Sequence, residues 1–389
     1  MEDHIDLVSG AFWGRNPQEE LGWLRAHAPV WRDDRNGVWG VATYDLVKQV
    51  SSQPKLFSSA GGIRPDTDPV PMMIDMDDPQ HWQRRKLVNK GFTPRRVRDQ
   101  ESSIRRTART LIDAATARGE FDLVWDVAAW LPLIVIGDAL GVEAPDREQL
   151  LRWSDDLLRA LGANDEEAMT AAMMASAGYH DYVAKIIAAR RDTPTDDLMS
   201  VLVHAEVDGD RLDDEEIVIE SLLILIGGDE TTRHVISGGA YQLLSHRERW
   251  EALVEDRSLL DTAIEEMLRW VSPIKNMART ATEDVELGGR KIPAGEKLLL
   301  LYPSANRDEA VFADPFTFDI RRSPNEHLAF GFGTHFCLGN SLARLELRVM
   351  FEELLDRMPD LALRDRVEPP YRPANFVSGY ETLPVVARG

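Results

Sequence analysis

The only cysteine of this 389-residue chain, Cys337, lies in a glycine-rich stretch. Residues 330–339 read Phe-Gly-Phe-Gly-Thr-His-Phe-Cys-Leu-Gly. Glycine permits positive φ and a close approach of the backbone, and the N–H groups of such a turn can stabilise a thiolate. Residues 340–347 have helix-forming composition and apolar spacing. We therefore expect Cys337 just ahead of a helix N-terminus, where the helix dipole also favours an anion.

A lone cysteine limits the chemistry that this stretch can perform. It cannot form an internal disulfide, and it cannot by itself build a zinc or iron–sulfur site. Three interpretations of Cys337 follow: a buried small apolar side chain, a catalytic nucleophile, or the single thiolate ligand of a haem iron.

A second group of reactive side chains follows a long apolar run. Residues 217–226 are nearly all apolar and predict a helix that is buried on most sides, and residues 227–232 then read Gly-Gly-Asp-Glu-Thr-Thr. Each glycine inside a helix costs about 1 kcal/mol relative to alanine, which packing alone does not explain. Gly228 would let a ligand approach the backbone, the Thr231 hydroxyl could donate to bound oxygen, and Glu230 could relay protons. Asp229 is expected to point elsewhere on the helix.

Two further pairs have the spacing of one helix face. His81 and Arg85 are four residues apart and together could hold a carboxylate, while Glu266 and Arg269, three apart, could form a bidentate ion pair. Either pair taken alone is also typical of an ordinary exposed surface.

These motifs, in this order, resemble those of the cytochrome P450 family. Residues 330–339 match its haem-binding signature and residues 227–231 its oxygen-activation signature. The resemblance implies a haem b cofactor with Cys337 as the axial thiolate and only protein ligand of the iron, and with Glu230 and Thr231 as the catalytic acid and hydroxyl. The other haem contacts that it implies are those of His81, Arg85, Gly228, Arg279, Phe330 and His335.

The same resemblance gives Glu266 and Arg269 a structural role in supporting the haem loop. The family's usual third member, an arginine in a Pro-x-Arg-Phe segment, is missing here, since Thr317 stands in its place. Arg321 or Arg322 could substitute for that arginine.

The implied fold is mostly α with a small β region: the P450 fold, shaped like a triangular prism, with a long central helix over the haem. We expect one domain over residues 1–389, with strands at roughly 30–60, 275–325 and 365–389. Residues 157–187 would form the mobile roof of the substrate site.

Several local stretches, among them residues 61–65, 71–77 and 372–379, resemble the actinobacterial P450s that hydroxylate the cholesterol side chain at C26/C27. The implied reaction inserts one oxygen atom of O2 into the terminal methyl of cholesterol or cholest-4-en-3-one. The side chains expected to contact this apolar substrate are Val70, Met72, Met73, Ile74, Ile274, Met277, Phe376 and Val377. Apolar residues would equally suit a fatty acid or a macrolide, or another polyketide. A non-catalytic haem sensor or carrier is the alternative of another class, but it would not need Glu230 and Thr231.

Charge and composition restrict the partners. The net charge of −21 argues against nucleic acid. Residues 84–109 are the exception, with ten Lys and Arg against two acids; they form either a solvated helix face or a docking patch for an acidic partner. Because the chain has no flavin or NAD fingerprint, we expect electrons from a ferredoxin and a ferredoxin reductase. The acidic N-terminus, the single cysteine and the lack of a long apolar run predict a cytoplasmic protein without a membrane anchor.

Overall fold

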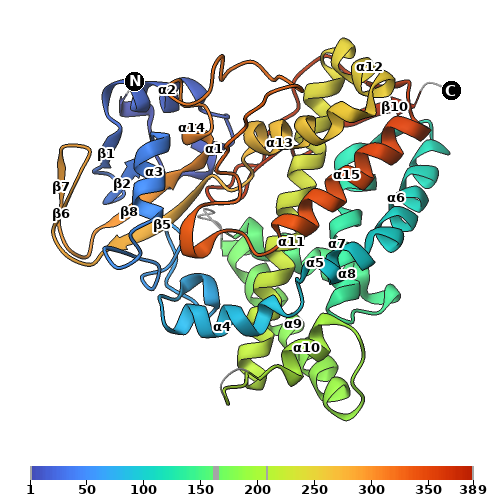
Figure 1. Ribbon diagram of the computed structural model, residues 1–389, viewed down its shortest axis with the longest axis horizontal. Helices are drawn as coiled ribbons and strands as arrows, with labels where there is room; N and C mark the ends of the chain where they lie inside the picture. The colour runs from blue at the N-terminus through green and yellow to red at the C-terminus, as the bar shows by residue number, and fades with distance from the viewer. Residues whose placement is uncertain (1, 161–165, 207–208, 388–389) are drawn as a thin grey trace.

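Helix α11 (Asp214–Leu244) runs through the centre of the molecule, and helices from the middle and the C-terminal part of the chain pack around it (Figure 1). The computed structural model describes residues 2–160, 166–206 and 209–387. The other helices of eight or more residues are α2 (Gln18–His27), α3 (Tyr44–Ser51), α4 (Gln80–Asn89), α6 (Glu101–Thr116), α7 (Trp130–Ala139), α8 (Arg147–Arg159), α9 (Glu166–Asp192), α12 (Arg247–Glu255), α13 (Leu260–Val271) and α15 (Asn340–Arg357). Shorter helices are α1 (Gly10–Trp13), α5 (Pro94–Asp99), α10 (Leu198–His204) and α14 (Tyr302–Ala305).

The start of α11 is set by its sequence. The Asp213 side chain accepts from the Glu216 N–H, and the Glu216 side chain accepts from the Asp213 N–H, which makes a capping box. Ile217, Val218, Ile224 and Leu225 of the apolar run 217–226 are buried, and α11 as a whole packs against α7, α13 and α15. The two glycines at 227 and 228 do not interrupt the helix, which continues to Leu244.

Most of the β structure lies at one end of the molecule, on the left of Figure 1. A five-stranded sheet has the order β1 (Val30–Asp33), β2 (Val38–Val41), β8 (Lys297–Leu301), β5 (Asn276–Ala281) and β3 (Phe57–Ser58). Within this sheet β2 and β8 pair in parallel, and the other neighbouring strands pair antiparallel. In the antiparallel pair of β5 and β8, Met277 lies opposite Leu300. This register places β5 along one wall of the site described below.

Two smaller sheets complete the fold. One has the order β4 (Glu120–Asp122), β10 (Pro384–Ala387) and β9 (Leu361–Leu363), and the other pairs β6 (Val285–Leu287) with β7 (Arg290–Ile292). Strands β4 and β9 lie outside the three β-containing ranges expected from the sequence. The mostly helical fold with a small β region is confirmed.

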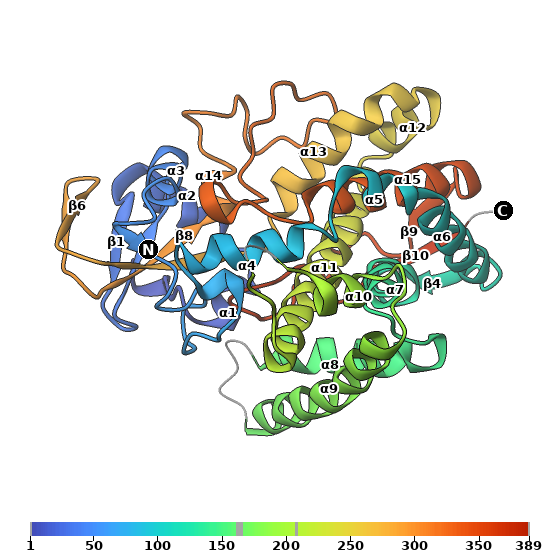
Figure 2. The ribbon, with the colours of Figure 1, turned by 60° about the horizontal axis from the view of Figure 1, so that its bottom comes forward.

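Helices α8 and α9 lie side by side along the bottom of Figure 2. They cover the end of α11 that carries its apolar run, where a roof was expected. Residues 161–165 of that expected roof lie outside the described residues. None of the helices in the described ranges is both long enough and apolar enough to span a membrane.

Candidate active site

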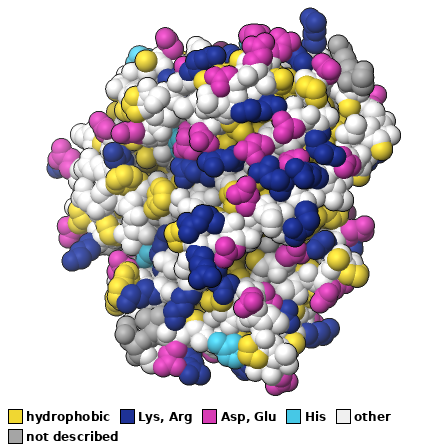
Figure 3. Space-filling model, turned by 45° about the vertical axis from the view of Figure 1, so that its right-hand side comes forward, with side chains coloured by type: hydrophobic (Ala, Val, Ile, Leu, Met, Phe, Trp, Pro, Cys, Tyr) yellow, Lys and Arg dark blue, Asp and Glu magenta, His cyan; other side chains and the backbone are white. Residues whose placement is uncertain are grey.

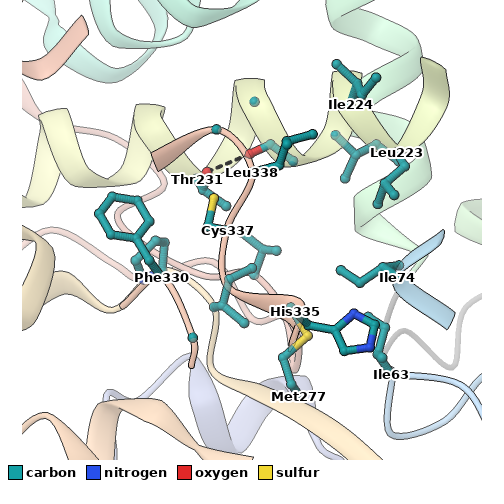
Figure 4. A pocket seen from close by; sticks show the side chains of 18 of the residues that line it. Ile63, Ile74, Leu223, Ile224, Thr231, Met277, Phe330, His335, Cys337 and Leu338 are labelled. Carbon is teal, nitrogen blue, oxygen red and sulfur yellow. Dashed lines mark hydrogen bonds between the residues drawn. The ribbon is translucent and has the colours of Figure 1, made fainter. Parts of the chain in front are cut away.

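A cavity of about 490 Å³ separates the cysteine loop from helix α11. The loop 330–339 and the start of α15 line one side, and residues 222–235 of α11 line another (Figure 4). Strand β5, the short 3-10 helix Met73–Asp75 and residues 376–377 close the remaining sides. Segments from five parts of the chain therefore meet around one space.

The loop around Cys337 is held by its own backbone. The Cys337 N–H donates to the Phe330 carbonyl at 2.9 Å, and the Asn340 side chain donates to the Cys337 carbonyl at 2.8 Å. Gly333 has φ +75°, and a Cβ there would lie 2.4 Å from the Ser51 carbonyl oxygen, so only glycine fits. Helix α15 begins three residues after Cys337, as expected from the sequence.

The Cys337 sulfur opens onto the cavity and points to the side on which Thr231 lies (Figure 4). Burial raises the pKa of the Cys337 thiol, while the backbone N–H groups of Gly339 and Asn340 and the charges of Arg85 and Arg344 oppose that rise. The amides and both cations therefore favour the thiolate.

Thr231 and Gly228 both line the cavity from α11. The Thr231 hydroxyl donates to the Gly227 carbonyl at 2.8 Å. A Cβ on Gly228 would lie 3.1 Å from the Ile136 side chain, so this glycine also lets α11 pack closely on α7. A Cβ on Gly227 would meet nothing within 4 Å.

Glu230 points away from the cavity into a buried cluster of charges. It is 1% exposed and pairs with Arg233, with His234 at 3.2 Å and with Arg372 at 3.3 Å. Burial alone would raise the pKa of Glu230, but the two arginines and His234 hold it below its usual range. Glu230 is therefore ionised and fixed in place, and only Thr231 of the expected catalytic pair faces the cavity.

Four basic side chains surround one end of the cavity: His81, Arg85, Arg279 and His335. The rings of His81 and His335 lie 4.1 Å apart, and burial together with the charge of Arg279 lowers the pKa of His335 to about 2. The His81 Nε2 is buried without a hydrogen-bond partner, and Arg279 is 5% exposed with its guanidinium donating to a backbone carbonyl. Arg279 is thus a buried cation without a carboxylate contact, which indicates a site for a bound anion.

The remaining walls are apolar. All eight residues expected to contact substrate line the cavity: Val70, Met72, Met73, Ile74, Ile274, Met277, Phe376 and Val377. The sequence reasoning missed Ile63, Leu222, Leu223, Ile226 and Glu346. Glu346 could have been found, because it shares a helix face with Leu342 and Ala343, four and three residues earlier on α15, which also line the cavity. It is the one acidic side chain among the described residues that line this cavity.

Glu266 and Arg269 form a fully buried ion pair behind the cysteine loop, with two contacts of 2.7 Å. Arg269 also donates to the Asn306 carbonyl at 2.8 Å, and the Asn306 side chain accepts from the Leu328 N–H at 2.7 Å, just ahead of the loop. Arg322 supplies the third member, because its guanidinium donates to Glu266 at 3.0 Å.

Known proteins share this arrangement over nearly the whole chain. A sequence model of the cytochrome P450 family matches residues 29–375. The chain belongs to the cytochrome P450 family. This P450 is therefore a haem-thiolate monooxygenase, as the sequence predicted.

Individual relatives agree with that assignment. A steroid C26-monooxygenase of Mycolicibacterium smegmatis is 57% identical over 384 residues, covering 98% of this P450 and 96% of the relative. A methyl-branched lipid omega-hydroxylase of Mycobacterium bovis is 41% identical over 410 residues, covering 98% and 94%. The crystal structure of CYP109E1 from Bacillus megaterium in complex with testosterone has a TM-score of 0.88 at 38% identity, covering 96% of this P450 and 100% of that chain.

The residues on the cavity walls fit a haem. A haem of the thiolate-ligated class needs one cysteine ligand and partners for two anionic propionates. Cys337 opens onto the cavity, and the four basic side chains include a buried, unpartnered His81 nitrogen and the buried Arg279 without a carboxylate contact. A porphyrin is flat and apolar, which suits the glycine-rich loop on one side and the apolar part of α11 on the other.

Proposed function

We propose that this P450 hydroxylates the terminal methyl of a steroid side chain, with cholesterol or cholest-4-en-3-one as substrate. The observation that carries the proposal is the set of eight apolar side chains on the walls of the cavity onto which Cys337 and Thr231 open. The relatives named steroid C26-monooxygenase support the choice of a steroid among apolar substrates.

In this proposal, Cys337 would ligate the haem iron, and His81, Arg85, Arg279 and His335 would hold the propionates. Gly228 and Phe330 leave room for the porphyrin. A thiolate-ligated haem, when bound, supplies the cleavage of O2 and the insertion of one oxygen atom into a C–H bond. The protein's own contribution is to orient the substrate methyl, exclude water and control protons.

Thr231 is the group of this chain best placed to position a proton at the oxygen site, because its hydroxyl lies on the cavity wall. Its own donation to Gly227 leaves the oxygen lone pairs free to accept from a water molecule. Glu230 precedes Thr231 in the chain. Its negative charge would hold the side chains of Arg233 and His234, one turn later on α11, in place.

Electrons would come from a ferredoxin and its reductase. Figure 3 shows Lys and Arg side chains spread over the face formed by α5, α6 and α15. Several of them are paired with acids: Arg105 contacts Glu352 and Glu353, and Arg109 contacts Glu353. Arg95 and Arg98 are both exposed, and the Arg95 guanidinium lies 3.7 Å from the exposed carboxylate of Asp99. Because such a surface pair is weak, both arginines would be available to an acidic partner.

A methyl-branched fatty acid is the second candidate substrate, favoured by the 41% identical lipid omega-hydroxylase. Substrate-induced changes of the haem spin state, measured with cholest-4-en-3-one, a methyl-branched fatty acid and a macrolide, separate the candidates. We expect the sterol to bind at least about tenfold more tightly, a difference of about 1.4 kcal/mol, and product analysis to give the terminal alcohol. Tighter binding of the fatty acid would favour the second candidate substrate. Oxidation on the sterol rings would refute hydroxylation of the side chain.

A further inference from the structure

A second cavity, of about 740 Å³, lies between helices α5, α6, α7 and α10, and the proposed function leaves it unused. Protein interiors are otherwise close-packed, so a space of this size needs an explanation. Three side chains line both this second cavity and the cavity beside Cys337: Phe92, Ile136 and Leu342. The wall between the two spaces is therefore only one side chain thick where these residues lie.

Ile136 brings the inner end of the second cavity to the central helix. It lies on α7, is 2% exposed and packs against α11 at Gly228, where a Cβ would lie 3.1 Å from its Cγ1. Gly228 and Thr231 both line the cavity beside Cys337. The second cavity therefore ends next to the turn of α11 that carries the Thr231 hydroxyl.

The lining of the second cavity changes from polar at the surface to apolar inside. Its exposed residues are all polar or charged, and they include Thr93, Asp99, Ser103 and Asp138. Its buried residues are all apolar: Ile104, Val135, Ile136, Leu198 and Leu342. An apolar floor offers water no hydrogen-bond partners, whereas it suits a small uncharged molecule.

The charges at the mouth do not form a site for an ion. Arg96 donates to the Asp196 carbonyl at 2.9 Å, and Asp138 pairs with Arg147 at 2.5 Å. The charged residues that line the second cavity are nearly balanced, with Lys90, Arg95 and Arg96 against Asp99, Asp138, Asp196 and Asp197. Neither sign of charge dominates, so the mouth gives no preference to a charged ligand.

We infer that the second cavity is an entrance through which O2 reaches the cavity beside Cys337 without passing the substrate. O2 is small, uncharged and apolar, which matches the floor. An apolar substrate in the cavity beside Cys337 lies beneath α8 and α9 and obstructs the path under those helices. Changes of rotamer at Phe92, Ile136 or Leu342, which core side chains undergo even in close-packed interiors, would open the thin wall.

A bulky side chain in the second cavity tests the route. Thr107, on α6, is half-buried and lines the second cavity but not the cavity beside Cys337. CO is also a small uncharged diatomic molecule, and its combination with the ferrous holoprotein after flash photolysis can be timed in the presence of a saturating substrate. Thr107→Trp should slow this rate at least about fivefold, because the indole ring fills the space.

Thr110→Trp is the matched control, since Thr110 is exposed one turn later on α6 and lines neither cavity. It should keep the wild-type rate. Without substrate, the path under α8 and α9 is open, so the effect of Thr107→Trp should shrink. If Thr107→Trp does not take up haem, Ser103→Trp fills the same cavity from an exposed position and should give the same slowing.

Xenon tests the floor without any variant, because apolar cavities bind it. Crystals of the wild-type holoprotein under xenon pressure should show an atom among Ile104, Val135 and Leu198. The inference rests on the oxygenase activity of the family and not on the steroid. Any substrate that changes the haem spin state serves in the CO measurement, so failure of the steroid proposal leaves both experiments intact.

Three results would overturn the inference. The first is a wild-type CO rate in a haem-loaded Thr107→Trp or Ser103→Trp variant with substrate bound. The second is equal slowing by Thr107→Trp and Thr110→Trp, which would show that added bulk on α6 acts through the structure and not through a blocked route. The third is a floor that takes up no xenon.

Discussion

The Arg322 guanidinium donates to the Glu266 carboxylate at 3.0 Å and thereby joins the segment after α14 to helix α13. Arg322 also donates to the backbone carbonyls of Ala313, Asp314 and Thr317. Glu266 is 0% exposed, so its charge depends on Arg322 and Arg269 for compensation. This buried triad holds the segments that lead into the cysteine loop.

Arg322→Ala should therefore destabilise the protein by about 3 kcal/mol, because it removes a charge-assisted hydrogen bond to the buried Glu266 carboxylate and three hydrogen bonds to backbone carbonyls. Urea unfolding and haem retention after gel filtration would measure the effect. Arg321→Ala is the matched control, since Arg321 is exposed and makes no contact with Glu266. Equal losses of stability for the two variants would show that Arg322 does not act through Glu266.

The cysteine ligand has a direct spectroscopic test. The ferrous CO complex of the wild type should show the red-shifted Soret band of a thiolate-ligated haem, and Cys337→Ser should lose it because a hydroxyl is a much weaker electron donor. Thr231→Ala, which changes the opposite wall of the cavity, should keep the band. A red-shifted band in the serine variant would exclude Cys337 as the ligand.

Thr231→Ala should bind haem and substrate as the wild type does but should divert electrons to hydrogen peroxide. Product per electron consumed should fall at least about tenfold, because the variant has no hydroxyl to position a proton. Thr231→Ser retains the hydroxyl and should recover most of the coupling. If alanine and serine couple equally well, the hydroxyl has no part in the reaction.

The sequence predicted those parts of the site whose residues are close together in the chain. The haem loop and the turn of α11 at Gly227–Thr232 are contiguous, so their geometry follows from local structure. The ion pair between Glu230 and Arg372 joins residues 142 positions apart, and only the fold brings them together. Sequence reasoning could therefore name Glu230 as an acid but could not foresee that arginines hold it ionised.

The sequence also could not decide whether Arg321 or Arg322 replaces the missing third member of the Glu266–Arg269 network. Neighbouring residues in an irregular segment point in different directions, and no periodicity fixes which one faces inward. The eight apolar cavity-lining residues were predicted because apolar side chains in loops and on strand β5 have few other places to be buried. The apolar face of α11 was read as core, although part of it lines the cavity.

Glu220 connects helix α11 to the wall of the cavity that carries Met73. Its carboxylate accepts from the Met73 N–H at 2.8 Å and contacts Arg84, and burial raises its pKa to about 7. The folded protein thus binds this proton more tightly than the unfolded chain does. The stability that the proton confers is complete below the unfolded pKa and is lost as pH rises through about 7.

Between pH 5 and 7, the free energy of unfolding of the wild type should fall by about 2 kcal/mol relative to Glu220→Gln, which cannot titrate. Urea unfolding at several pH values measures this difference. Glu216→Gln removes the other carboxylate that pairs with Arg84, one turn earlier on α11, and so separates loss of that contact from the titration. Parallel pH curves for wild type and Glu220→Gln would show that Glu220 does not titrate in this range.

The last prediction concerns Arg95 and Arg98 on α5. Both are exposed, whereas the neighbouring Arg96 donates to the Asp196 carbonyl at 2.9 Å and is best left unchanged. If an acidic ferredoxin docks here, reversal of both charges to Glu should raise the ferredoxin concentration needed for half-maximal turnover several-fold. The wild-type rate should also fall as salt is added, because screening weakens the attraction.

Substrate binding should not change in the Arg95/Arg98 variant, since neither side chain lines the cavity beside Cys337. Reversal of Arg290 and Lys291, on strand β7 at the far end of the molecule, changes the net charge equally and is the matched control. A general effect of net charge would slow both variants alike, whereas docking on α5 slows only the first. Wild-type kinetics for the first variant at low ionic strength would remove α5 from the interface and direct the search to Arg344 and Arg348, which are paired with Glu265 and Asp261 on α13.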